Sequence, residues 1–80
     1  MIREYIDAAM SKAVYKTLSD DGSWFGRIPG FQGVWANNNT LEEGRVELEE
    51  VLEEWLLLRI SRNLDVPIVD DLDLKFRESA

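Results

Sequence analysis

The sequence predicts an α+β fold in which one long helix packs on a three-stranded antiparallel sheet. Three observations favour it: a long amphipathic stretch with a marked start, three preceding segments rich in β-branched and aromatic residues, and turn-forming residues between those segments. A short helix at the N-terminus and a short edge strand after the long helix complete the order α-β-β-β-α-β. We expect residues 1–80 to form one domain, close to the size at which a single core becomes marginal.

The first predicted element is a short amphipathic helix at about residues 2–10. Its apolar residues follow the spacing of one helical face, and they are Ile2, Tyr5, Ile6, Ala9 and Met10. A helix this short is marginal in isolation. It must therefore dock, either on the back of the long helix or on the open face of the sheet.

Three strands are predicted at about residues 12–18, 23–28 and 34–37. The segment 19–22, with sequence SDDG, is a turn that joins the first two strands into a hairpin, and a loop containing Pro29 leads to the third. Alternation within the second strand places Phe25 on the face opposite to Trp24.

The long helix is predicted at about residues 40–63. Thr40 and Glu43 have the spacing of a capping box, in which the Thr40 hydroxyl accepts from the backbone three residues on and Glu43 reaches back to the Thr40 N–H. Asn63 is suited to end the helix. The core-facing stripe is expected to consist of Leu41, Gly44, Leu48, Val51, Leu52, Trp55, Leu56 and Leu58. Within it, Gly44 is interpreted as a point of close approach to the sheet.

A second apolar set lies roughly opposite that stripe and makes the C-terminal half of the helix apolar nearly all round. It consists of Val46, Leu57, Ile60 and Leu64. We expect this back face to be covered by the N-terminal segment, by another subunit or by a partner. After the helix, residues 66–69 are predicted to form a fourth strand, which Pro67 restricts to an edge.

Composition limits the chemistry. The chain contains neither Cys nor His, which removes disulfides, thiolate metal sites and the commonest catalytic base. Nine Lys and Arg residues against sixteen Asp and Glu residues give a net charge of -7, which argues against direct nucleic-acid binding. We expect a protein with no catalytic residues, no metal and no cofactor, located in the cytoplasm, because neither a signal peptide nor a membrane-spanning run is visible.

Several weaker patterns have an ordinary structural interpretation beside a functional one. The paired aspartates at 20–21 and 70–71, together with Asp73, could serve as the metal carboxylates of a degenerate nuclease, but both pairs lie in turns, where Asp is common. The aromatic residues suit base stacking only beside a positively charged groove. In an acidic chain, packing in the core or at an interface is the favoured interpretation. Gly30 and Gly33 lack the Lys and Ser or Thr of a phosphate-binding loop.

From Asp21 to Trp55 the sequence resembles the N-terminal domain of the HicB family of antitoxins. Segment 21–29, DGSWFGRIP, is similar to the family's Asp-Gly-x-aromatic-x-small-x-aliphatic-Pro hairpin. Segment 31–34, FQGV, resembles Leu-Pro-Gly-Cys, with Gln32 in place of Pro and Val34 in place of Cys. Segment 40–44, TLEEG, resembles Thr-x-Glu-Glu-Ala. The family usually carries a C-terminal DNA-binding domain, whereas this chain ends at Ala80.

The resemblance implies a partial RNase H-like sheet-and-helix arrangement and a binding function. Family members hold a small basic RNA-cleaving toxin of HicA type and mask its active site. The acidic run of the long helix has two open interpretations: a solvated surface, or electrostatic complementarity to such a partner.

The expected function is that of an antitoxin-type protein-binding module that forms a homodimer or higher oligomer. The alternative is a self-associating structural module without a toxin partner. The residues expected to contact a partner are Phe25, Trp35, Glu50, Glu53, Glu54, Leu57 and Ile60.

Overall fold

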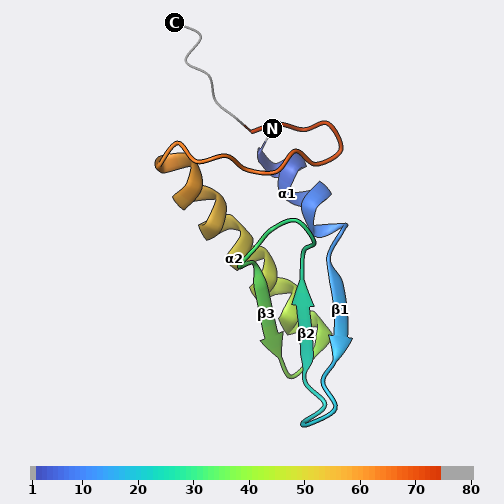
Figure 1. The fold of residues 1–80 in the computed structure, drawn as a ribbon. Helices are drawn as coiled ribbons and strands as arrows, with labels where there is room; N and C mark the ends of the chain where they lie inside the picture. The colour runs from blue at the N-terminus through green and yellow to red at the C-terminus, as the bar shows by residue number, and fades with distance from the viewer. Residues whose placement is uncertain (1, 75–80) are drawn as a thin grey trace, which may run out of the picture.

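A computed structural model of the chain describes residues 2–74, so the outer ends of the predicted 1–80 domain lie outside it (Figure 1). The elements are α1 (Ile2–Met10), β1 (Val14–Thr17), β2 (Trp24–Arg27), β3 (Trp35–Asn38) and α2 (Leu41–Ser61). The predicted α+β fold is confirmed, and the observed bounds differ from the predicted ones by one or two residues at most ends. α2 lies behind the sheet in the view of Figure 1, and α1 lies beyond the end of the strands.

The three strands form an antiparallel sheet in the order β1-β2-β3, so β1 and β3 are both edge strands. The register aligns Tyr15, Gly26 and Ala36 across the sheet. A Cβ atom built on Gly26 would lie 2.7 Å from Tyr15 Cδ1 and 3.6 Å from Leu48 Cδ2, so this row of residues faces α2. Tyr15 covers the position that the missing side chain of Gly26 leaves free.

The start of α2 follows the sequence closely. Thr40 is extended, with φ -125°, and its hydroxyl oxygen accepts a hydrogen bond from the Glu43 N–H at 3.1 Å. The Glu43 carboxylate accepts from the Thr40 hydroxyl at 3.2 Å, where the capping box predicted the Thr40 N–H as its donor. At the other end, Asn63 adopts φ 57° and the N–H of Leu64 bonds to the carbonyl of Arg59, which confirms Asn63 as the stop.

The buried stripe of α2 is narrower than predicted. Gly44, Leu48, Leu52 and Leu56 are buried, whereas Leu58 is 48% exposed and does not face the core. The expectation that Gly44 permits a close approach is also wrong: the nearest atom to an added Cβ is Asn38 Cβ at 4.0 Å, an ordinary van der Waals distance. Four residues spaced by one turn are enough to seat a helix on this small sheet.

α1 docks on the core side of α2, next to the sheet. Tyr5, Ile6 and Ala9 of α1 are buried in the same cluster as the leucines of α2. The Tyr5 ring meets Phe31 edge-on at 6.3 Å between centroids. The N-terminal segment was one of three predicted ways to cover the back face of α2. That possibility is wrong, because α1 packs on the core instead.

The predicted edge strand at 66–69 is wrong. Val69 forms an isolated antiparallel bridge with Leu72, across a tight turn in which Asp70 and Asp71 have positive φ values of 47° and 66°. The Pro67 carbonyl accepts a hydrogen bond from the Tyr5 hydroxyl. Pro67 has no N–H to offer a sheet, and the Asp pair turns the chain back on itself before a strand can extend.

Candidate protein-binding surfaces

The residues predicted to contact a partner fall on different sides of the molecule. Phe25 and Trp35 lie on the sheet face turned away from α2, whereas Glu50, Glu54 and Leu57 are exposed on α2. Glu53 and Ile60 are only partly exposed: Glu53 bonds within the chain, and Ile60 packs against the core. The seven residues thus do not form one surface.

The open sheet face carries two stacked aromatic rings flanked by cations. The centroids of Phe25 and Trp35 are 5.9 Å apart with an interplanar angle of 27°, and Trp35 is 55% exposed. The register places Lys16 beside Phe25, and Arg27 beside Trp35. Together with Val14 we call these residues the aromatic face. Sequence analysis missed the two cations; alternation along each strand, combined with the register, contains that signal.

A shallow groove runs between the β3 edge and α2. It is lined by Asn37, Asn38, Asn39, Glu42, Glu43, Val46, Glu47, Glu50, Val51 and Glu54, and we call it the acidic groove. The Asn38 amide donates a hydrogen bond to the Glu47 carboxylate across the groove. Within residues 2–74, no ion pair joins a Lys or Arg to any of these carboxylates. The groove therefore presents concentrated negative charge next to an open strand edge.

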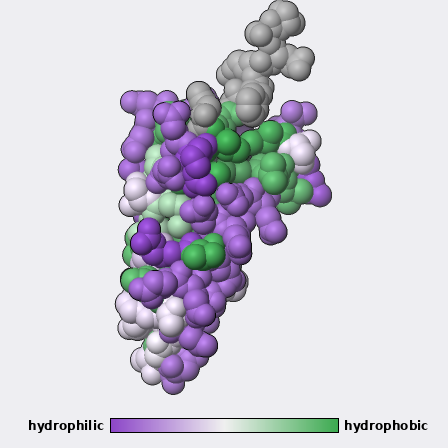
Figure 2. Space-filling view, turned by 180° about the vertical axis from the view of Figure 1, so that it is seen from behind, coloured by the Kyte–Doolittle hydropathy of each residue, from purple (hydrophilic) through white to green (hydrophobic). Residues whose placement is uncertain are grey.

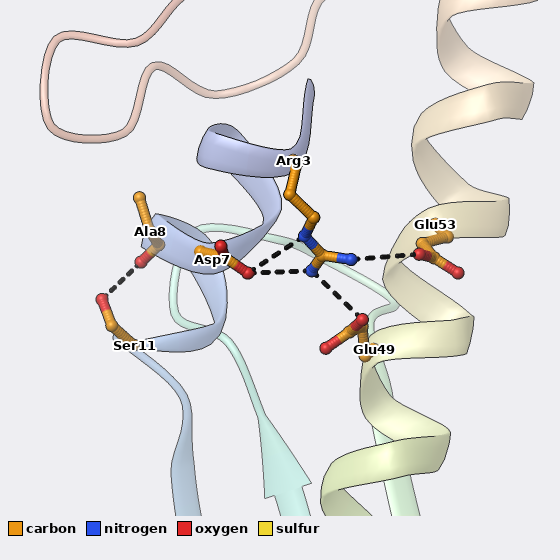
Figure 3. Close-up of polar contacts among 6 residues, drawn as sticks. All are labelled: Arg3, Asp7, Ala8, Ser11, Glu49 and Glu53. Carbon is orange, nitrogen blue, oxygen red and sulfur yellow. Dashed lines mark hydrogen bonds and ion pairs between the residues drawn. The ribbon is translucent and has the colours of Figure 1, made fainter. Parts of the chain in front are cut away.

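The opposite flank of α2 carries less negative charge, because Arg3 of α1 lies against it (Figure 3). Arg3 Nη2 lies 2.9 Å from Asp7 Oδ1 and 3.1 Å from Glu49 Oε2, and Arg3 Nη1 lies 3.9 Å from Glu53 Oε2. These groups are partly exposed, so each pair contributes little to stability. Their effect is to neutralise one flank of the acidic run and leave the groove side negative.

The outer surface at the C-terminal end of α2 is apolar. Leu57 is 64% exposed, Leu58 48%, Leu64 46% and Ile68 64%, and we call these four residues the apolar end. Figure 2 shows the contrast from behind: hydrophobic residues gather in the upper part of the molecule, and hydrophilic ones cover most of the lower part. Of the back face predicted from the sequence, Val46, Leu57 and Leu64 are exposed in the single chain, whereas Ile60 packs against the core.

The pKa values of Tyr5 and Asp21 are shifted from their ordinary values. Burial, together with the charge of Asp73, raises the pKa of Tyr5 to about 12. The Ser23 N–H, which donates to Asp21 Oδ1 at 3.0 Å, lowers the pKa of the Asp21 carboxyl. Because Asp21 is occupied in holding the hairpin turn next to Gly22, its chemistry is that of a turn residue.

Residues 2–74 contain no group of three or more His, Cys, Asp or Glu side chains that could hold a metal ion. In the same residues, no helix is both long enough and apolar enough to cross a membrane. The candidate binding surfaces of this part of the chain are the acidic groove, the aromatic face and the apolar end.

Comparison with known proteins places the fold in a family. None of the curated proteins matches the sequence. The crystal structure of TTHA0281 from Thermus thermophilus is similar, with a TM-score of 0.88 and 29% sequence identity, over 96% of this chain and 95% of that one. The family model described as UPF0150-like matches residues 4–67, which span α1, the whole sheet and α2. The chain belongs to the UPF0150-like family.

Proposed function

We propose that the chain is a non-catalytic, HicB-like antitoxin-type module that binds a small basic RNA-cleaving toxin in the cytoplasm and covers its active site. The observation that carries this proposal is the acidic groove between β3 and α2. The family match over residues 4–67 and the HicB-like hairpin at 21–29 support it.

The charge distribution supports the groove, and not the aromatic face, as the proposed toxin site. The groove contains the carboxylates of Glu42, Glu43, Glu47, Glu50 and Glu54. A basic partner is attracted to it from a distance, which raises the association rate and rejects acidic competitors. The aromatic face instead carries Lys16 and Arg27, whose charges would repel a basic partner.

The strand edge beside the groove gives the partner a second means of recognition. β3 pairs with β2 on one side only, so the other side presents backbone groups to solvent next to the carboxylates. An extended basic segment can pair with such an edge while its side chains meet the helix. Val46 and Val51 supply apolar contact within the same groove.

The composition supports a binding function over an enzymatic one. The whole chain lacks His and Cys, so it offers no imidazole and no thiolate, and a general base would have to be a carboxylate, Lys or Tyr. Asp21, one of the aspartates considered as a nuclease metal ligand, accepts a hydrogen bond from the Ser23 N–H in a turn. We propose that the chain acts by covering a partner and has no reaction of its own.

Co-expression with the product of the small neighbouring open reading frame tests the proposal. We expect a pull-down of a 1:1 or higher complex and rescue of growth when the toxin is induced. Glu50→Lys places a cation in the groove and should weaken both readouts. Asp20→Lys makes the same charge change on the exposed hairpin turn and should leave both unchanged. Absence of a complex and of rescue for the unchanged chain would remove the antitoxin function.

A further inference from the structure

The apolar end is the largest concentration of exposed hydrophobic side chains in the described residues. Among residues 2–74, eight large hydrophobic residues are at least 43% exposed, and four of these are Leu57, Leu58, Leu64 and Ile68. Figure 2 shows that this region is continuous where α2 gives way to the following segment. Hydrophobic surface gathered in this way on a small protein marks an interaction site.

An acidic, an apolar and a basic residue follow one another along one side of the helix. Four residues lead from Glu54 to Leu58 in α2, and four more lead to Arg62, the C-cap residue. The three therefore follow one another along the same side of the helix and its end. All three side chains are exposed. Within residues 2–74, neither the Glu54 carboxylate nor the Arg62 guanidinium has a side-chain hydrogen bond or ion pair.

Arg62 differs from the neighbouring Arg59 in this respect. Arg59 donates from Nε to the Asp65 carbonyl at 2.7 Å and lies 4.9 Å above the centroid of the Trp55 ring. Arg59 is therefore committed to closing the C-terminal turn of its own chain. Arg62 remains available to an outside carboxylate.

We propose that the apolar end is a homodimer interface in which two copies of α2 pack antiparallel about a twofold axis beside Leu58. Each of Glu54 and Arg62 lies about 6 Å from Leu58 along the helix, at a rise of about 1.5 Å per residue. Reversal of the second helix brings Glu54 of one copy level with Arg62 of the other, and the axis repeats this pair. Leu57 and Leu58 of both copies fill the centre.

Charge selects a second copy and the antiparallel orientation. A basic protein would be drawn to the acidic groove nearer the start of α2, and not to a patch that carries Arg62. In a parallel dimer, the acidic halves of the two helices would lie side by side and repel each other. In an antiparallel dimer, the acidic halves point in opposite directions. Glu54, at one end of the groove, pairs with Arg62 of the second copy, while Glu42, Glu43, Glu47 and Glu50 stay outside the interface. This proposal is independent of the antitoxin function.

The oligomeric state of the purified chain tests the interface. Sedimentation equilibrium at about 10 to 100 μM, a range that resolves micromolar Kd values, should give twice the 9.2 kDa mass of the chain. Leu58→Glu places two carboxylates at the axis and should give a monomer. Val14→Glu is the matched control, because Val14 is 47% exposed on the sheet face away from α2, and it should remain a dimer. Circular dichroism verifies that both variants are folded.

A charge exchange tests the orientation itself. Glu54→Arg and Arg62→Glu are each expected to weaken dimerisation by about tenfold, because like charges then face each other at two places. An equimolar mixture of the two variants restores both opposite-charge pairs and should recover the affinity of the unchanged chain. A monomer at every concentration, a dimer that survives Leu58→Glu, or a mixture that fails to recover would each overturn the proposal.

Discussion

The two halves of α2 share one interior and have different exteriors. Inside, Gly44 and Leu48 lie over the sheet, and Leu52 and Leu56 continue the same stripe into the cluster that contains α1. Outside, the first half lines a groove of carboxylates, while the second half exposes leucines. The interior is what the fold requires. The change from acidic to apolar residues along the exterior is not needed for folding. The exterior is therefore the surface from which binding partners can be inferred.

The contrast between inside and outside is sharpest at two adjacent leucines in the second half. Leu56 is fully buried and Leu57 is 64% exposed. Leu56→Ala should lower the free energy of unfolding by about 2–5 kcal/mol, because it leaves a cavity in the core. Leu57→Ala should change it by less than about 0.5 kcal/mol in the monomer. Urea denaturation of the two variants at low protein concentration measures both values, and equal losses would contradict the assignment of the two faces.

α1 packs beside the second half of α2, and the stability that α1 contributes through Tyr5 should change with pH. The raised pKa of Tyr5, about 12 against an ordinary 10.0, means that the folded state holds the phenol proton more tightly than the unfolded state does. The stabilisation is therefore complete below pH 10 and is lost as the pH rises towards 12. Tyr5→Phe should remove this loss and, by leaving the Pro67 carbonyl without its donor, cost about 1–2 kcal/mol at neutral pH.

A comparison of unfolding curves for the original chain and Tyr5→Phe at several alkaline pH values isolates Tyr5 from the other groups that titrate there. The two chains should converge in stability as the pH rises from 10 to 12. Parallel curves over that range would show that the Tyr5 phenol ionises equally easily in both states.

The first half of α2 depends on its cap. Thr40→Ala removes the oxygen that accepts the Glu43 N–H and should cost about 1 kcal/mol of stability. Thr40→Ser keeps that oxygen and serves as the control, and it should be about as stable as the original chain, because Ser caps a helix at least as well as Thr. Thermal unfolding of the three chains measures the difference. Identical losses for Ala and Ser would mean that the methyl group, and not the hydroxyl, matters.

The smallest predicted effect is a gain in stability. The structure leaves room for a Cβ at Gly44, whose nearest neighbour is 4.0 Å away. Gly44→Ala should therefore stabilise the chain by about 0.5–1 kcal/mol, through the helix propensity of Ala. Gly26→Ala is the contrasting variant, because its Cβ would lie 2.7 Å from the Tyr15 ring and should destabilise the chain. A loss of stability in Gly44→Ala would instead support the close approach to the sheet that the sequence suggested.

Local patterns were sufficient for most of the fold. The cap at Thr40, the turn at 19–22 and the stop at Asn63 are determined by nearby residues, and all three are present. The errors concern tertiary choices. Leu58 belongs to the predicted stripe by spacing, but the small sheet covers too narrow an arc of α2 to bury it. The edge strand did not form because the chain reverses at Asp70 and Asp71, and the Tyr5 hydroxyl, more than sixty residues away in sequence, donates a hydrogen bond to the Pro67 carbonyl.

The candidate sites could be predicted from the sequence only in part, because tertiary packing determines which residues come together. Helical spacing identified Leu57 as a back-face residue, and strand alternation separated Phe25 from Trp24. The pairing of Glu53 with Arg3 requires knowledge of where α1 docks, which no local pattern gives. The grouping of Asn37–Asn39 with the carboxylates of α2 likewise depends on the packing of helix on sheet.

The hydrogen bond from the Tyr5 hydroxyl to the Pro67 carbonyl brings the first and last described segments to one end of the molecule, opposite the β1–β2 hairpin turn (Figure 1). An affinity tag or fluorophore attached beside either of these segments will therefore sit close to the leucine surface that we assign to self-association. A label inserted in the exposed turn at Asp20 and Gly22 instead lies at the far end, clear of that surface. Protein for binding measurements is best labelled there.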